Sequence, residues 1–125
     1  DADEREAIRH KMAPALSEGF PEREPETGEG IVDWRLDADA PPAAREAQAG
    51  AVAAFDASDE LDEISVPTLI LHGTGDRVLP VENGELLADA LADAQVTFYE
   101  DGPHLFFIEE SDRVNDRLRG FLDDA

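Results

Sequence analysis

The sequence lacks cysteine altogether. This absence excludes disulfide bonds, thiolate metal sites and a cysteine nucleophile, although it leaves the redox compartment undetermined. The sequence also lacks any apolar run near the roughly 18 residues that span a bilayer, and residues 1–10 lack the apolar core of a signal peptide. From these absences we expect a soluble, cytoplasmic protein that does not contact a membrane.

Positive charge is scarce as well. The chain has 10 Lys and Arg residues against 31 Asp and Glu residues, for a formal net charge of −21, and Lys11 is its single lysine. Such a surface stays hydrated in concentrated salt, so we interpret the protein as halophilic, with an acidic protein of a mesophile as the alternative. We expect no nucleic-acid partner, because the surface repels phosphates and offers no basic stripe.

The first half of the chain is predicted to be partly helical, in a protein whose 125 residues suit one compact domain or a piece of one. Residues 3–13 carry apolar side chains at helical spacing, and Pro14 would end that helix. Residues 17–42 are rich in Gly, Pro and Glu, and we expect a long loop there. A second helix is expected over residues 42–55, where alanines form a small-residue face that must pack closely.

The character of the chain changes at Ile64. Residues 66–73 (VPTLILHG) form a short apolar run that predicts a strand buried on both faces of a parallel sheet. A helix over residues 80–94 and a second strand over residues 95–100 complete a βαβ unit, which requires a parallel pair and a right-handed crossover. A last helix is expected after Ser111, whose side chain can cap it.

Asp76 and His104 each follow one of the two predicted strands. Because parallel strands end at the same edge of a sheet, the loops that carry these residues should meet there. A carboxylate beside an imidazole fixes the tautomer and orientation of the ring, and it stabilises the imidazolium that forms when the ring takes a proton. The pair therefore predicts a general base with its orienting acid. Spacing alone leaves open that Asp76 is a turn residue and His104 a loop histidine.

The pattern P-T-L-x-L-H-G-x-x-D-x-x-x-P, followed by a strand and a G-x-H loop, resembles the C-terminal end of the α/β-hydrolase superfamily. The resemblance covers residues 60–122. It implies an α/β fold in which the C-terminal βαβα portion of a parallel sheet follows helical cap segments. The cap-like region would be residues 1–58, and the core portion residues 59–125. Small esterases and enol-lactonases are the most similar members.

The resemblance also implies roles for single residues. Asp76 would be the acid and His104 the base of a catalytic triad in the chain order Ser, Asp, His. Trp34, Leu105 and Phe106 would contact a small ester or lactone substrate. No cofactor and no metal are expected, since the many carboxylates have no histidine at ligand spacing. His72 is expected to support the turn that follows its strand.

One part of the superfamily's machinery is missing from the sequence. No G-x-S-x-G motif is present, and none of the four serines lies between a strand and a helix in that way. We therefore expect the chain to be the rear portion of a serine hydrolase about twice as long, inactive alone, which pairs with its missing N-terminal half or with a second copy. The alternatives are a noncatalytic acidic module for binding or assembly, and a relative that cleaves carbon–halogen or carbon–carbon bonds.

Overall fold

The computed structural model describes residues 1–125, which group into two compact units. The first unit comprises Asp1–Lys11 and Gly19–Asp59, and the second comprises Met12–Glu18 and Glu60–Ala125. A boundary after residue 58 between a cap-like region and a core stays a prediction. None of the helices combines the length and the apolar character that are needed to cross a membrane.

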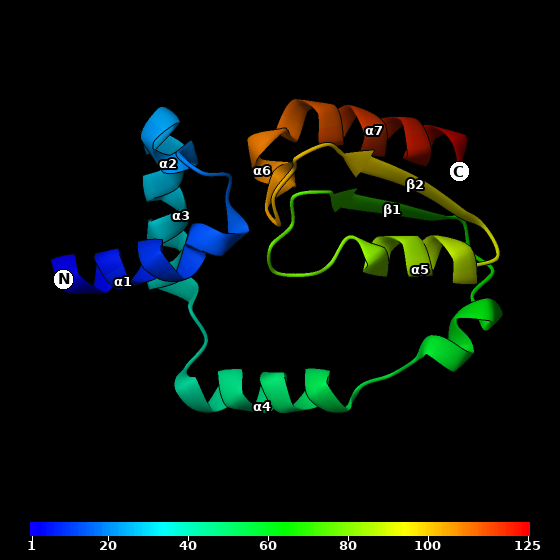
Figure 1. Ribbon diagram of the computed structural model, residues 1–125, viewed down its shortest axis with the longest axis horizontal. Coiled ribbons are helices and arrows are strands. Elements are labelled where there is room, and N and C mark those ends of the chain that lie inside the picture. The colour runs from blue at the N-terminus through cyan, green and yellow to red at the C-terminus, as the bar shows by residue number, and fades with distance from the viewer. The chain divides into compact units, whose positions relative to one another are not determined.

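The first unit is built from helices (Figure 1). Helix α1 (Ala2–Met12) confirms the first predicted helix, and Pro14 lies in the 3₁₀ turn Ala13–Ala15 that follows it. Helix α4 (Pro42–Ala54) confirms the second, with proline in its first turn. No residue of α4 is buried, so the close packing expected of its alanine face is wrong. Each alanine methyl offers little apolar area, and burying it would stabilise the unit only slightly.

The loop predicted over residues 17–42 is wrong, because helices α2 (Phe20–Arg23) and α3 (Pro25–Ala38) occupy most of it. Contacts far apart in sequence outweigh the low helix propensity of this segment. Ile31 and Val32 of α3 are 4% and 2% exposed. Gly28 of α3 lies directly against Pro21 of α2. A Cβ atom added at Gly28 would be only 3.1 Å from the Cβ atom of that proline. The glycine thus permits a close contact between α2 and α3.

Ion pairs add to the first unit. Arg5 of α1 bonds to Glu29 and Asp33 of α3 at 2.6 and 2.7 Å, and Arg9 bonds to Glu29 at 2.6 Å. Hydrogen bonds from Arg5, which has the larger effect, and from Arg9 hold the pKa of the Glu29 carboxyl below its ordinary value. Pairs this exposed contribute little each, so they orient the helices more than they stabilise them.

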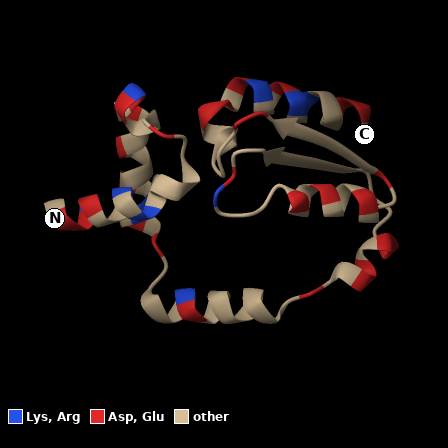
Figure 2. Cartoon of the chain, in the orientation of Figure 1, with Lys and Arg blue, Asp and Glu red and all other residues tan.

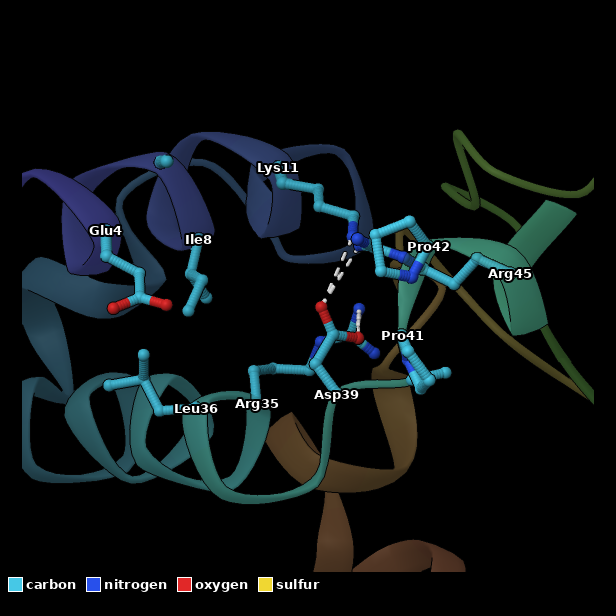
Figure 3. A pocket seen from close by; sticks show the side chains of 11 residues that line it. Glu4, Ile8, Lys11, Arg35, Leu36, Asp39, Pro41, Pro42 and Arg45 are labelled. Atoms are coloured by element: carbon cyan, nitrogen blue, oxygen red, sulfur yellow. Dashed lines mark hydrogen bonds and ion pairs between the residues drawn. The ribbon is translucent and has the colours of Figure 1, made fainter.

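A cavity of about 470 Å³ lies in the first unit between α1, α3 and the start of α4 (Figure 3). Asp39, just after α3, accepts bonds there from Arg35 at 2.8 Å and Arg45 at 3.1 Å, and its carboxylate lies 3.8 Å from the Lys11 ammonium. Ile8 of α1 lines the apolar side of the cavity. One carboxylate therefore joins three segments of a unit that has little apolar core.

The second unit contains a parallel strand pair between helices (Figure 1). Strands β1 (Thr68–Gly73) and β2 (Ala94–Tyr99) pair in register from Thr68 with Ala94 to Gly73 with Tyr99. Helices α5 (Glu82–Ala90) and α7 (Ser111–Asp124) lie on opposite sides of the strands, and the short α6 (Phe106–Glu109) follows β2. The α/β fold with a small parallel sheet is confirmed.

Apolar packing on β2 anchors the second unit. The ring of Tyr99 is 1% exposed and stacks on Phe106 with centroids 4.8 Å apart, and Val114 of α7 is 3% exposed in the same cluster. Neither strand contains a charged residue, so charge gathers on helices and loops (Figure 2). The packing of Tyr99 on Phe106 and Val114 thus anchors the end of β2, just before the loop that carries His104.

Two details of the second unit differ from expectation. Ser111 is the first residue of α7 and makes no capping bond, since Glu110 occupies the N-cap position; the predicted serine cap is wrong because the helix begins one residue earlier. Strand β1 is only partly covered, with Ile70 and Gly73 buried and its other residues half-buried. A two-stranded sheet leaves one edge of β1 unpaired, which explains the incomplete burial.

Candidate active site

The loop after β1 holds Asp76 in a fixed orientation. Its Oδ1 atom accepts hydrogen bonds from the backbone amides of Val78 and Leu79, both at 2.8 Å. An aspartate that bonds to amides two and three residues ahead stabilises a tight turn. The Asp76 side chain is only 4% exposed. The carboxylate therefore has one oxygen committed to the turn and a second oxygen available for another partner.

His104 is that partner. Its Nδ1 atom lies 2.9 Å from Oδ2 of Asp76, across 28 positions of sequence. The imidazole is 33% exposed, so it is reachable from solvent while the carboxylate is not. With Nδ1–H donating to Asp76, the ring has Nε2 left to accept a proton. The two loops thus form a buried acid with a partly exposed base, and Asp76 is both a turn residue and a partner of His104.

Glycines let the two loops approach each other this closely. At Gly73 an added Cβ atom would overlap the carbonyl oxygen of Gly102, so no larger residue fits there without a shift of the backbone. The Gly75 amide donates to the same Gly102 oxygen at 2.9 Å, and the Asp101 amide donates to the Thr74 hydroxyl at 2.8 Å. The acid loop and the histidine loop are therefore bonded to each other near the backbone as well as through the side chains of Asp76 and His104.

The electrostatic setting keeps Asp76 charged. Burial alone would raise the pKa of this carboxyl. Hydrogen bonds from the Leu79 amide, His104 and the Val78 amide together outweigh burial, and they hold the pKa of Asp76 below its ordinary value. An ionised carboxylate at neutral pH is what an imidazole needs if it is to become positively charged.

A second histidine contacts the same carboxylate. Nε2 of His72, at the end of β1, lies 3.3 Å from Oδ2 of Asp76 and 3.3 Å from the carbonyl oxygen of Leu79. Its side chain is 12% exposed, and a Cβ atom on Gly84 would crowd its ring. The contact with Leu79 agrees with the expected support of the turn. The contact with Asp76 was not predicted, although the position of His72 four residues before Asp76 could have indicated it.

The other predicted site residues lie in different surroundings. Leu105 is half-buried beside His104, whereas the Phe106 ring is 8% exposed and occupied by its stacking on Tyr99. Trp34 is 62% exposed on α3 of the first unit. A substrate-binding role for each of these three stays a prediction.

No sequence pattern predicted the contacts of three residues in this region, Arg77, Ser17 and Glu109. Arg77 donates to the carbonyl oxygens of Ala13 and Leu16, and Ser17 bonds to Glu109, 92 positions away. Only folding brings such distant residues together, so no local pattern could reveal them. No serine is bonded to His104, and no group of three or more His, Asp or Glu residues is arranged to hold a metal ion.

A family model described as "Serine aminopeptidase, S33" matches residues 37–111, which is more than half of the chain. A protein of Synechocystis sp. provisionally named a non-heme chloroperoxidase is 40% identical over 68 residues. That match covers 54% of this chain and 25% of the relative.

Two solved structures resemble nearly the whole chain. Est816, described as an N-acyl homoserine lactone degrading enzyme, superposes with a TM-score of 0.73 at 28% identity over 95% of this chain and 48% of that one. A meta-cleavage product hydrolase superposes with a TM-score of 0.72 over 97% of this chain and 46% of that one; at 23% identity it supports the fold alone. The chain thus spans about half the length of these structures and a smaller share of the curated relative.

Proposed function

This chain belongs to the family described as serine aminopeptidase S33, in the α/β-hydrolase superfamily, and on that premise we propose that it supplies the acid and base of a serine hydrolase. Asp76 is the acid and His104 is the base. The substrate is a small carboxylic ester or lactone, as the lactone-degrading structural relative suggests. Leu105, Phe106 and Trp34 are proposed to contact that substrate.

The observation that carries this proposal is the 2.9 Å bond between Nδ1 of His104 and Oδ2 of Asp76. Two loops at the same end of a parallel strand pair converge to make it, which is where ligands gather in open α/β sheets. A histidine paired by chance on a surface would not need a carboxylate that is 4% exposed and held by two amides. The arrangement suits a base whose ring must be oriented before the reaction.

The proposed chemistry is acyl transfer through a serine. Nε2 of His104 takes the hydroxyl proton as the serine oxygen attacks the carbonyl carbon, and Asp76 stabilises the imidazolium. The imidazolium then protonates the leaving alkoxide, or the ring oxygen of a lactone, as the carbon–oxygen bond breaks. Water then attacks the carbonyl carbon of the acyl-enzyme while Nε2 of His104 takes a proton from it. The imidazolium returns that proton to the serine oxygen as the acyl bond breaks, which releases the carboxylic acid and the free serine.

The nucleophile is proposed to lie outside these 125 residues, on a partner half of the same protein. The oxyanion donors, which supply a large share of the rate in such enzymes, belong to that half as well. Ser17 is a poor candidate for the nucleophile, because its hydroxyl and its amide are both bonded to Glu109. The isolated chain is therefore expected to have no His104-dependent activity.

The test compares the full-length product of the gene with the 125-residue chain, in molar salt, with p-nitrophenyl acetate and an N-acyl homoserine lactone. His104→Ala should lower kcat of the full-length protein on the order of 10³-fold or more. His10→Ala removes an exposed histidine of α1 and should leave kcat unchanged.

The outcomes separate the competing functions. Full-length protein that binds but never turns over either substrate, with or without His104, would indicate a noncatalytic module. Turnover of haloalkanes in place of esters would indicate a hydrolase of carbon–halogen bonds. Cleavage of a carbon–carbon bond in place of an ester bond would indicate a hydrolase of carbon–carbon bonds. His104-dependent turnover by the 125-residue chain would place the nucleophile within it and contradict the proposed division.

A further inference from the structure

A five-residue segment, Ala13–Ser17, contacts both loops of the candidate site. It belongs to the second unit, although the stretches of chain on either side of it belong largely to the first. Ala15 and Leu16 are 7% and 4% exposed. We name residues 13–17 the bridging segment, and all of its interactions considered below lie within the second unit.

Arg77, the residue after Asp76, holds one end of the bridging segment. Its Nη2 atom donates to the carbonyl oxygens of Ala13 and Leu16, both at 2.9 Å. The Leu16 amide already donates to the Ala13 carbonyl oxygen at 3.3 Å, and Arg77 adds a second bond to that oxygen as well as a bond to the Leu16 carbonyl oxygen. The planar guanidinium can satisfy both carbonyls at once from a fixed direction. Arg77 therefore ties the acid loop to the bridging segment, in addition to the bonds that join the acid loop directly to the histidine loop.

The histidine loop is attached to the same segment. The amide of Leu105, the residue after His104, donates to the carbonyl oxygen of Ala15 at 2.9 Å. Glu109, at the end of α6, accepts one bond from the Ser17 amide at 2.9 Å and another from the Ser17 hydroxyl. The residues that directly follow the acid and the base thus bond to carbonyls no more than three positions apart.

We infer that the bridging segment sets the distance between the two catalytic loops, with Arg77 and Glu109 as positioning residues for the Asp76–His104 pair. The catalytic meaning of this inference rests on the proposed function, whereas the geometric part does not. Neither side chain bonds to Asp76 or His104; Arg77 and Glu109 instead bond to the same bridging segment. Small displacements matter because a shift of about 1 Å in a catalytic group can cost on the order of 10² in rate.

The test follows the proton between His104 and Asp76 directly. A histidine Nδ1 proton held by a carboxylate gives a low-field ¹H resonance, which His104→Ala identifies in the full-length protein. Arg77→Met keeps the length of the side chain and removes its donors. We expect the resonance to be lost or broadened, and kcat to fall about 10- to 100-fold with KM nearly unchanged. Arg77→Lys, which restores a donor, should recover part of both.

Arg117→Met is the matched control. Arg117 also donates two bonds, to Thr97 at 3.0 Å and to Gln95 at 2.8 Å, but both bonds join α7 to β2 and neither reaches a loop of the site. It should leave the resonance and kcat in place. Equal effects of Arg77→Met and Arg117→Met would overturn the inference, because general loosening of the unit would then explain both.

A milder pair of variants covers the case in which Arg77→Met does not fold. Ser17→Ala and Glu109→Gln each remove one contact of the bridging segment, and each should broaden the resonance; an unchanged signal in both would overturn the inference. The two proposals fail separately. An inactive protein whose resonance responds to these variants contradicts the proposed function alone, and an active protein whose resonance ignores them contradicts the positioning role alone.

Discussion

The two oxygens of Asp76 have separate tasks. Oδ1 accepts hydrogen bonds from the Val78 and Leu79 amides that make the turn, whereas Oδ2 accepts a bond from Nδ1 of His104 and lies 3.3 Å from Nε2 of His72. Because each oxygen has its own partners, the turn and the imidazole can be perturbed separately. This separation allows substitutions that distinguish a structural carboxylate from a catalytic one.

Asp76→Asn should retain the turn and impair the pair. The amide oxygen can still accept the two backbone N–H groups, while the NH₂ group faces His104 and favours the wrong tautomer of the ring. In the full-length enzyme we expect kcat to fall on the order of 10⁴-fold with little change in the circular dichroism spectrum. Asp76→Ala, which lacks both oxygens, should also lower the thermal midpoint. Equal midpoints for the two variants would contradict the separate roles.

The lowered pKa of Asp76 also predicts a dependence of stability on pH. The carboxyl pKa is lower in the folded than in the unfolded state, so ionised Asp76 stabilises the fold. This contribution is complete above the unfolded value of about 3.9 and is lost as the pH falls through the folded value. Denaturant titrations at several pH values should show a steeper acid limb for wild type than for Asp76→Asn. Parallel limbs would contradict the prediction.

Gly73 limits what the site tolerates. The Gly102 oxygen occupies the place that a Cβ atom on Gly73 would need. Gly73→Ala should therefore push the histidine loop away and lower the free energy of unfolding by about 3 kcal/mol, near the upper end for overpacking. Gly120→Ala is the control, since nothing lies within 4 Å of that position in α7, and it should be neutral or slightly stabilising. Denaturant titration of both variants measures the difference.

Among the elements, α3 and α7 show how tertiary contacts override local signals. Helix α3 contains two glycines, which lower its helix propensity, yet the burial of Ile31 and Val32 stabilises it and the arginine pairs from α1 orient it. Helix α7 begins at Ser111 but gains no cap from its hydroxyl. It is anchored instead by Val114 and by Arg117, which reaches β2.

Ser111→Ala tests the start of α7. A true N-cap serine contributes about 1 kcal/mol, whereas an uninvolved surface hydroxyl contributes less than about 0.5 kcal/mol. Because Glu110 occupies the cap position, we expect the smaller change in the free energy of unfolding, measured by denaturant titration. A loss near 1 kcal/mol would restore the serine cap that the sequence suggested.

The whole molecule carries a net charge of −21, and this predicts a strong response to salt. At low ionic strength the carboxylates repel one another over about 10 Å or more, and molar salt shortens this range to roughly 3 Å. The thermal midpoint should therefore rise steadily between about 0.1 and 2 M KCl. A midpoint that is independent of salt would contradict the halophilic interpretation and favour an acidic protein of a mesophile.

The second unit leaves apolar surface uncovered. Val66 before β1 is 63% exposed, Val96 and Phe98 of β2 are 39% and 36% exposed, and one edge of β1 is unpaired. Such edges favour association. This exposure supports the proposed pairing with a missing half or with a second copy.

The parallel βαβ unit follows from the sequence alone, because apolar runs of strand length separated by a helical pattern have few other solutions. The sequence also predicted that Asp76 and His104 would meet, since each lies in a loop after one of the two parallel strands, and their side chains are bonded at 2.9 Å. The loop predicted over α3 and the serine cap predicted for α7 were wrong, because contacts between residues distant in the sequence outweigh local propensity there.

The contacts that hold the site together, by contrast, are evident only in the folded chain. The bonds of Arg77 to Ala13 and Leu16, and of Glu109 to Ser17, join residues 61 to 92 positions apart. No periodicity or motif predicts such contacts, because they form only when the folded backbone brings distant segments of the chain side by side. Short patterns thus predict which residue types meet at the site, whereas the geometry of the site depends on the fold.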